Sequence, residues 1–214
     1  MNTTKIDHLI LGINDLDRGI ELFAQKTGIT PRFGGHHPDL GTHNALVSLG
    51  NGAYLEILAP KDKSVPTKAP FNGLENFNQL TPCGWAITVS DIDIIIDELS
   101  GLGSKVMGPV PGSRKSSEGI TLQWRAAFIQ SDDGPTINPF FSNWSELTIH
   151  PSITEPGGCT LNDFEISGSE DEPLIKLLRS MSLNFRLTPS VDTPPATLLG
   201  LSLHSPAGIV TLSV

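Results

Sequence analysis

The sequence has little that would suit a secreted, membrane or nucleic-acid-binding protein. It has only two cysteines, Cys83 and Cys159, without CxxC spacing, which favours two reduced, buried thiols over a disulfide or a zinc site. No apolar run approaches the roughly 20 residues needed to cross a bilayer, and the first residues do not resemble a signal peptide. The formal net charge is −9, and the few basic residues form no stripe that would bind phosphates. We therefore expect a cytoplasmic protein with no nucleic-acid and no membrane partner.

Glycine and proline are abundant, with 21 and 17 residues, which favours many short strands and turns over a helical bundle. Three times, a short apolar strand is followed by an amphipathic helix. These helices are expected to begin at Leu16, Ile92 and Leu174, roughly 80 residues apart. Further strands follow each helix, so the chain reads as three blocks of the order β-α-β-β-β.

The blocks define the expected domain organisation. We predict a first module in residues 1–60, a linker rich in Pro, Lys and Asn in 61–82, and a second module in 83–145. A third, shorter module in 159–214 is expected to pack on the same domain. One such unit covers only one face of its sheet, so two units are expected to curl together into an open, curved mixed sheet with a cleft. The predicted fold class is α+β.

Two polar residues interrupt apolar strands in the first module. His8 lies in the first expected strand, and Glu56 lies in the last, within YLEILA. Polar side chains that point into a core need a partner, and a metal ion or a substrate would serve both. The alternative interpretation is a structural histidine at His8 and a solvent-facing carboxylate at Glu56.

Four segments of the chain resemble the vicinal oxygen chelate superfamily and, within it, the glyoxalase-like domain proteins. They are DHLILGINDLDRGIELFAQKTGITP, GGHHPDLGTHNALVSLGNGAYLEILAP, GWAITVSDID and PFFSNW. The resemblance implies a divalent metal (Zn, Fe, Mn, Ni or Co) in the cleft, bound by the first and last strands of each module. His8 and Glu56 match these positions in the first module. In the second module Gly84 occupies the position that corresponds to His8, and the last expected strand, 137–143, contains no His, Asp or Glu.

Further side chains are candidates for the same site. Glu56 would act as a metal ligand or as a general base, and His43 would supply a third ligand or an acid/base group. Asn44, at the start of the same strand as His43, is expected to bind the substrate. Gln123 and Arg125 share one face of a later strand, where Arg125 would clamp a carboxylate or phosphate. The alternative for Arg125 is a surface cation.

Other histidines and aromatic residues are expected outside the site. We interpret His36 and His37 as parts of a surface loop. Trp85, Trp124 and Trp144 are interpreted as core packing. No GxSxG motif supports a serine nucleophile, and the glycines form no phosphate-binding fingerprint.

These observations favour an enzyme that acts on a small oxygen-rich metabolite. The expected chemistry is metal-assisted proton transfer, an isomerase or lyase step through an enolate-like intermediate. The alternative is a metal-free protein that binds or sequesters a small molecule on the same fold, which the missing ligands of the second module favour. A third interpretation is an interaction module that assembles as a homodimer.

Overall fold

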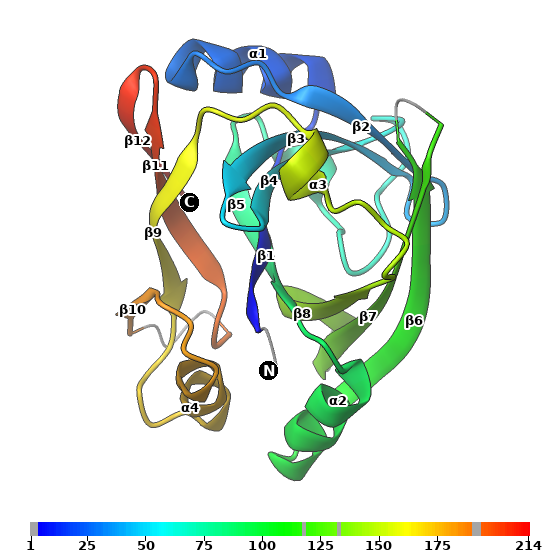
Figure 1. Cartoon of the computed structure of the whole chain (residues 1–214), viewed down its shortest axis with the longest axis vertical. Helices are drawn as coiled ribbons and strands as arrows, with labels where there is room; N and C mark the ends of the chain where they lie inside the picture. Colours follow the sequence, from blue (N-terminus) through cyan, green and yellow to red (C-terminus); the bar gives the residue numbers. More distant parts are fainter. Residues whose placement is uncertain (1–3, 117–118, 132–133, 190–193) are drawn as a thin grey trace.

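The computed structural model describes residues 4–116, 119–131, 134–189 and 194–214. Its main feature is an 8-stranded curved sheet with the strand order β2-β3-β4-β1-β5-β8-β7-β6 (Figure 1). Strands β1 and β5 pair antiparallel in the middle of this sheet, so the sheet consists of two halves. A separate sheet of 4 strands packs beside it.

The first half of the large sheet comes from one β-α-β-β-β unit. Its elements are β1 (Lys5–Gly12), α1 (Leu16–Thr27), β2 (Arg32–His37), β3 (Thr42–Gly50) and β4 (Ala53–Pro60). The Asp15 side chain accepts a hydrogen bond from a free amide at the start of α1, and Gly28, with a φ of 77°, ends the helix. The turn Gly50-Asn51-Gly52 joins β3 to β4 with positive φ at all its residues, as a tight hairpin requires.

The second half repeats this unit. Its elements are β5 (Thr81–Thr88), α2 (Ile92–Gly101), β6 (Lys105–Lys115), β7 (Thr121–Ser131) and β8 (Gly134–Trp144). The repeated modules and the open, curved mixed sheet of the predicted α+β class are therefore confirmed. Asp132 and Asp133, where we also expect a turn from the sequence Asp-Asp-Gly, lie outside the described residues.

Alternation along the central strands separates two apolar layers. Leu9 and Leu11 of β1, like Leu55 and Ile57 of β4, belong to the hydrophobic cluster that includes the buried side chains of the helices. Ile10 faces the opposite side and belongs to a second cluster on the inner face of the curve. Burial of each large aliphatic side chain contributes roughly 1.5–3 kcal/mol, so both faces of the sheet are strongly specified.

The third segment forms the smaller sheet. Its elements are β9 (Thr160–Ser167), α4 (Pro173–Ser180), β10 (Arg186–Thr188), β11 (Leu198–Ser205) and β12 (Gly208–Ser213). Their order along the chain is again β-α-β-β-β, but the strand order is β10-β9-β11-β12. In the first unit, the first strand β1 pairs with the last strand β4 and with β5 of the second unit. In the third segment, the first strand β9 pairs instead with the second and third strands, β10 and β11. The segment thus repeats the order of elements and has a different sheet.

The smaller sheet packs on the helix-covered face of the larger one. The Trp85 Nε1 group of β5 donates a hydrogen bond to the Ala196 carbonyl at 2.7 Å. The ring of Phe164 lies 5.2 Å from that of Trp85, and both side chains are buried in one cluster that spans the two sheets. This continuous cluster joins the third segment to the rest of the protein.

Two connecting segments also pack on the large sheet. Residues 61–80 include the short helix η1 (Leu74–Asn76) and place Phe71 and Leu74 against the inner face. The segment 145–158 contains α3 (Pro151–Thr154) and lies along β3, where the Ser48 amide donates to the Pro156 carbonyl at 2.8 Å. Both segments help to form the site described below.

The two cysteines are free, as the sequence predicts, with Cys159 buried and Cys83 half-buried. Burial raises the pKa of the Cys83 thiol to about 12, so this thiol is inert at neutral pH. Among the described helices, none has the length and apolar character needed to cross a lipid bilayer.

The shared cluster predicts that both sheets unfold together. Phe164→Ala is expected to destabilise the protein by about 3–4 kcal/mol, because it leaves a cavity between the sheets. Urea unfolding followed by tryptophan fluorescence and by circular dichroism measures this. We expect a single transition at the same midpoint for both signals, and two separate transitions in the wild type would contradict the shared core.

Candidate functional site

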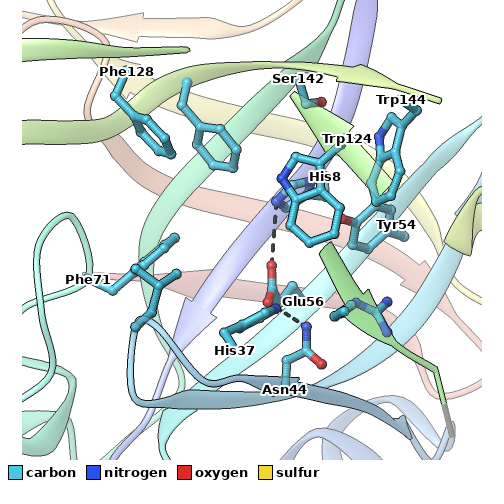
Figure 2. A pocket seen from close by; sticks show the side chains of 13 residues that line it. His8, His37, Asn44, Tyr54, Glu56, Phe71, Trp124, Phe128, Ser142 and Trp144 are labelled. Carbon is cyan, nitrogen blue, oxygen red and sulfur yellow. Dashed lines mark hydrogen bonds and ion pairs between the residues drawn. The ribbon is translucent and has the colours of Figure 1, made fainter. Parts of the chain in front are cut away.

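A cavity of about 80 Å³ lies on the inner face of the large sheet (Figure 2). Both halves of the sheet and the segment 61–80 contribute to it. The polar side chains in its wall are His8, His37, Asn44, Glu56, Arg114 and Ser142. The apolar and aromatic ones are Leu40, Tyr54, Phe71, Trp124, Phe128, Phe140 and Trp144. A few polar groups in an otherwise apolar, enclosed space are typical of a small-molecule site.

A β-bulge at the start of β1 positions the first of these groups. The pairing of β1 with β5 shifts register between Ile6 and His8, so Asp7 is an extra residue in the strand. A bulge bends the strand and re-aims its side chains, and bulges are frequent next to active sites. As a result, the Asp7 Oδ2 and His8 Nδ1 atoms lie 2.7 Å apart.

Asp7 is fully buried and accepts hydrogen bonds from three different segments. Its Oδ2 atom accepts from His8 Nδ1, and its Oδ1 atom accepts from Trp144 Nε1 and from His150 Nε2, each at 2.9 Å. Burial raises the pKa of Asp7, but the hydrogen bonds from His150 and His8 outweigh burial and hold the pKa far below its usual range. Asp7 is therefore ionised at neutral pH. An ionised acceptor requires the proton of His8 on Nδ1, which leaves Nε2 directed into the cavity.

His8, Glu56 and Asn44 form a connected group in the cavity wall, as the dashed lines in Figure 2 show. His8 Nε2 lies 3.5 Å from Glu56 Oε2, and Asn44 Nδ2 donates to Glu56 Oε1 at 2.7 Å. All three side chains are buried. The firm contact at Oε1 fixes the carboxylate, and the longer one at Oε2 leaves this oxygen able to interact with a ligand.

Aromatic rings fix the orientation of the His8 ring. Tyr54 stacks on it with ring centres 4.5 Å apart, and the Phe140 ring packs against it in a T-shaped arrangement with ring centres 5.3 Å apart. Burial raises the pKa of Tyr54 well above its usual value, so the phenol is neutral. His8 therefore has one orientation, which places Nε2 next to Glu56.

The structure brings together three of the residues predicted from the sequence, namely His8, Asn44 and Glu56. The His43 ring instead stacks against that of His36 at 5.9 Å, and neither is part of the cavity wall. Burial lowers the pKa of His43, so it is mainly neutral at neutral pH.

Gln123 and Arg125 lie outside the cavity, on the opposite face of β7 from Trp124. They line a separate surface groove, where Arg125 Nη1 lies 3.3 Å from Asp93 Oδ2 of α2. The functions predicted for His43, Gln123 and Arg125 stay predictions, and the cavity geometry does not support them.

Several residues of the cavity were not predicted from the sequence. The prediction of a surface loop at His36 and His37 is wrong, because both residues lie at the end of strand β2 and pair with β3. His36 is exposed, whereas His37 is half-buried and lines the cavity. Burial lowers the pKa of His37, which keeps it neutral. Trp124 and Trp144 line the cavity in addition to packing on each other. The local sequence around these residues carries no signal that would separate a cavity wall from a core or a loop.

The second half of the sheet lacks the metal ligands that the family resemblance implies. In the first half, Glu56 pairs with the residue two positions after His8. In the second half, Phe140 pairs with the residue two positions after Gly84. Gly84 and Phe140 are therefore the structural counterparts of His8 and Glu56, and neither can bind a metal.

The described residues contain no group of three or more His, Cys, Asp or Glu side chains arranged to hold a metal ion. Protein metal sites of the predicted kind use three or four protein ligands. His8 and Glu56 supply two, and the Phe140 ring stands against His8 where a further ligand would be needed. The residues present do not fit the metal site that the resemblance implies.

The two paired modules and the inner cavity define a protein of the vicinal oxygen chelate fold. The family model described as "Glyoxalase-like domain" matches residues 6–181, and the chain belongs to this family. No curated protein matches the chain in sequence.

Several solved structures match most of this chain. A hypothetical protein from Staphylococcus aureus is 16% identical, with a TM-score of 0.63, and the match covers 99% of this chain and 86% of that one. Methylmalonyl-CoA epimerase from Mycobacterium tuberculosis is 20% identical over 66% of this chain and 88% of that one, with a TM-score of 0.46. A hypothetical protein from Bacillus halodurans is 16% identical over 69% and 99%, with a TM-score of 0.49. At 16% identity, the match to the Staphylococcus aureus protein shows the fold alone.

The Asp7 network predicts a large effect of one substitution on stability. Asp7→Asn is expected to destabilise the protein by about 3 kcal/mol at pH 7, because it removes a fully buried charge to which His8, Trp144 and His150 all donate. Urea denaturation measures this change. An effect below about 0.5 kcal/mol, the size typical of surface positions, would show that the network does not form.

The same network predicts a pH dependence. Because folding lowers the pKa of Asp7, its contribution to stability is fully present above the pKa of the unfolded chain, near 4, and is lost as pH falls toward the folded pKa. The difference in unfolding free energy between the wild type and Asp7→Asn should therefore shrink between pH 5 and pH 2.5. A difference that stays constant over this range would contradict an ionised, hydrogen-bonded Asp7.

Proposed function

We propose that the cavity catalyses proton transfer at a carbon atom next to a carbonyl group of a small molecule, an isomerase-type reaction. The observation that carries the proposal is the buried line from Asp7 through His8 to Glu56, which ends at the cavity. A carboxylate, an imidazole and a second carboxylate in this order form an acid–base relay. The line is buried, and aromatic rings surround it.

Glu56 is the base in this proposal. Its carboxylate, held at Oε1 by Asn44, takes the proton from the substrate carbon at Oε2, and the electrons of the broken C–H bond form an enolate. The proton can pass to His8 Nε2 across the 3.5 Å contact, and Asp7 stabilises the imidazolium that results. Return of the proton to the other face or to a neighbouring atom completes the isomerisation.

Ser142 supports this chemistry with a donor for the substrate oxygen. Its hydroxyl lines the cavity, is almost completely buried and has no hydrogen-bond partner in the described part of the chain. A buried hydroxyl without a partner costs free energy, which a ligand oxygen would recover. A hydrogen bond from Ser142 to the carbonyl oxygen would also stabilise the enolate, because the surrounding aromatic rings exclude water.

A metal-assisted version of the reaction would need a divalent ion at His8 and Glu56. Gly84 and Phe140 add no ligand, so the steps above use protein groups alone.

The donor set predicts weak metal binding. After incubation with Zn²⁺ or Mn²⁺ and dialysis into metal-free buffer, elemental analysis should find no stoichiometric metal in the wild type, because two ligands hold a metal weakly. One equivalent of metal that His8→Ala or Glu56→Ala removes would contradict this prediction and restore the metal-assisted reaction.

The second candidate function is binding or sequestration of a small molecule without turnover. It is favoured by the replacement of the second pair of ligand positions by Gly84 and Phe140, and by the enclosed aromatic wall. On this alternative, the polar groups of the cavity orient a ligand and transfer no proton.

Exchange of carbon-bound hydrogen distinguishes the two functions. In D₂O, the wild type should accelerate incorporation of deuterium next to the carbonyl of butanone or 2-oxobutyrate, followed by ¹H NMR. Glu56→Gln should lower the rate by roughly 100-fold or more, because it removes the base. The control, Glu21→Gln, changes an exposed carboxylate on α1 and should keep the wild-type rate.

Wild-type exchange no faster than that of Glu56→Gln with both probes would contradict the proposal. Probe binding without exchange, detected by quenching of the fluorescence of Trp124 and Trp144 in the cavity wall, would then support the binding function.

A further inference from the structure

We infer that the substrate of this site carries a carboxylate and that Arg114 binds it, an inference that rests on the proposed function and names its substrate class. Arg114 lies on β6, and its side chain reaches the same cavity as His8 and Glu56. It is 6% exposed, an unusual degree of burial for an arginine.

The backbone contact of Arg114 explains why it is held in the cavity. Its Nη1 atom donates to the Gly34 carbonyl of β2 at 2.5 Å. β2 and β6 are the two edge strands of the large sheet, and Figure 1 shows that the curvature brings them next to each other. The hydrogen bond joins these edges and fixes the guanidinium above the cavity.

Within the part of the chain that the structure describes, the Arg114 side chain is buried without a carboxylate at ion-pair distance. Glu56 lines the same cavity, but its contacts are to Asn44 and His8. A buried guanidinium with five N–H donors and no counter-charge is costly, and an anionic ligand group would offset that cost.

The chemistry of the cavity selects a carboxylate among anions. A guanidinium matches the planar carboxylate with two parallel hydrogen bonds. Arg114 balances the single charge of a carboxylate. A phosphate dianion would keep one unbalanced negative charge in the cavity that also contains the Glu56 carboxylate. The unpartnered hydroxyl of Ser142 remains available for a second oxygen, such as the carbonyl next to the reacting carbon.

An adjoining cavity provides room for the rest of the substrate. It measures about 250 Å³ and shares His37, Leu40, Trp124 and Phe128 with the inner cavity. Its remaining wall is mainly apolar and includes Pro70, Met107 and Val110. The substrate class that fits both cavities is an oxo acid with one carboxylate and a short apolar chain.

Arg125 is the competing position for the carboxylate. Its side chain is 45% exposed, lies in the outer groove and is already paired with Asp93. Of these two arginines, Arg114 is the one that shares a cavity with the acid–base pair, so we assign the carboxylate to Arg114.

The test compares two probes in the deuterium exchange assay, 2-oxobutyrate and butanone, which differ by a carboxylate in place of a methyl group. We expect the wild type to prefer 2-oxobutyrate in kcat/KM, and Arg114→Gln to lower this preference roughly tenfold, mainly through KM. The preference of Arg114→Lys for 2-oxobutyrate should lie between those of the wild type and Arg114→Gln, because lysine keeps the charge and loses the two parallel hydrogen bonds of the guanidinium. Lys115→Gln removes the same charge from the next, exposed residue and should keep the wild-type preference.

Structural damage in Arg114→Gln would lower both rates and leave their ratio unchanged, and this result would overturn the inference. It would also be overturned if Arg125→Gln, and not Arg114→Gln, reduced the preference for 2-oxobutyrate.

A binding measurement separates this inference from the proposed function. Butyrate should quench tryptophan fluorescence at concentrations roughly tenfold lower than butyramide, which has the same shape and no charge, and Arg114→Gln should abolish the difference. Inorganic phosphate should not displace butyrate. Equal binding of butyrate and butyramide, or displacement by phosphate, would overturn the carboxylate assignment. If no probe undergoes exchange but butyrate binds through Arg114, the proposed catalysis fails and the carboxylate site stands.

Discussion

The buried charge of Asp7 is the constraint on which the site depends. An isolated carboxylate in a protein interior is costly, and it is tolerated here because His8, Trp144 and His150 all donate to it. These donors come from β1, from the end of β8 and from the segment after it, so the network ties both halves of the sheet to a connecting segment. It also determines which nitrogen of His8 faces the cavity, and with it the relation of His8 to Glu56.

The two halves of the sheet share a backbone pattern and have diverged in chemistry. The first half provides His8, Asn44 and Glu56, whereas the second half presents Phe140 and Gly84 at the counterpart positions. The second half contributes mainly aromatic side chains to the cavity wall, together with Arg114 and Ser142. This division explains how a member of the glyoxalase-like family keeps the inner cavity although its described residues hold no full set of metal ligands.

Local rules made much of this fold predictable. The cap at Asp15, the helix end at Gly28 and the Gly50-Asn51-Gly52 turn depend on neighbouring residues alone, and such local signals are visible in a sequence. His8 and Glu56 were identifiable because polar residues stand out in apolar strands. The remaining features depend on contacts between distant parts of the chain: His150 meets Asp7 across 143 positions, and Arg114 meets Gly34 across 80. For the same reason, the element order of the third segment did not reveal its strand order.

The most direct test of this account is the protonation of the His8 imidazole, measured by ¹⁵N NMR at neutral pH with Asp7→Asn as the reference. The account predicts a proton on Nδ1, with a strongly downfield shift that reflects the bond to Asp7, and an Nε2 atom available to Glu56. A neutral ring with its proton on Nε2, unchanged by the substitution of Asp7, would contradict it.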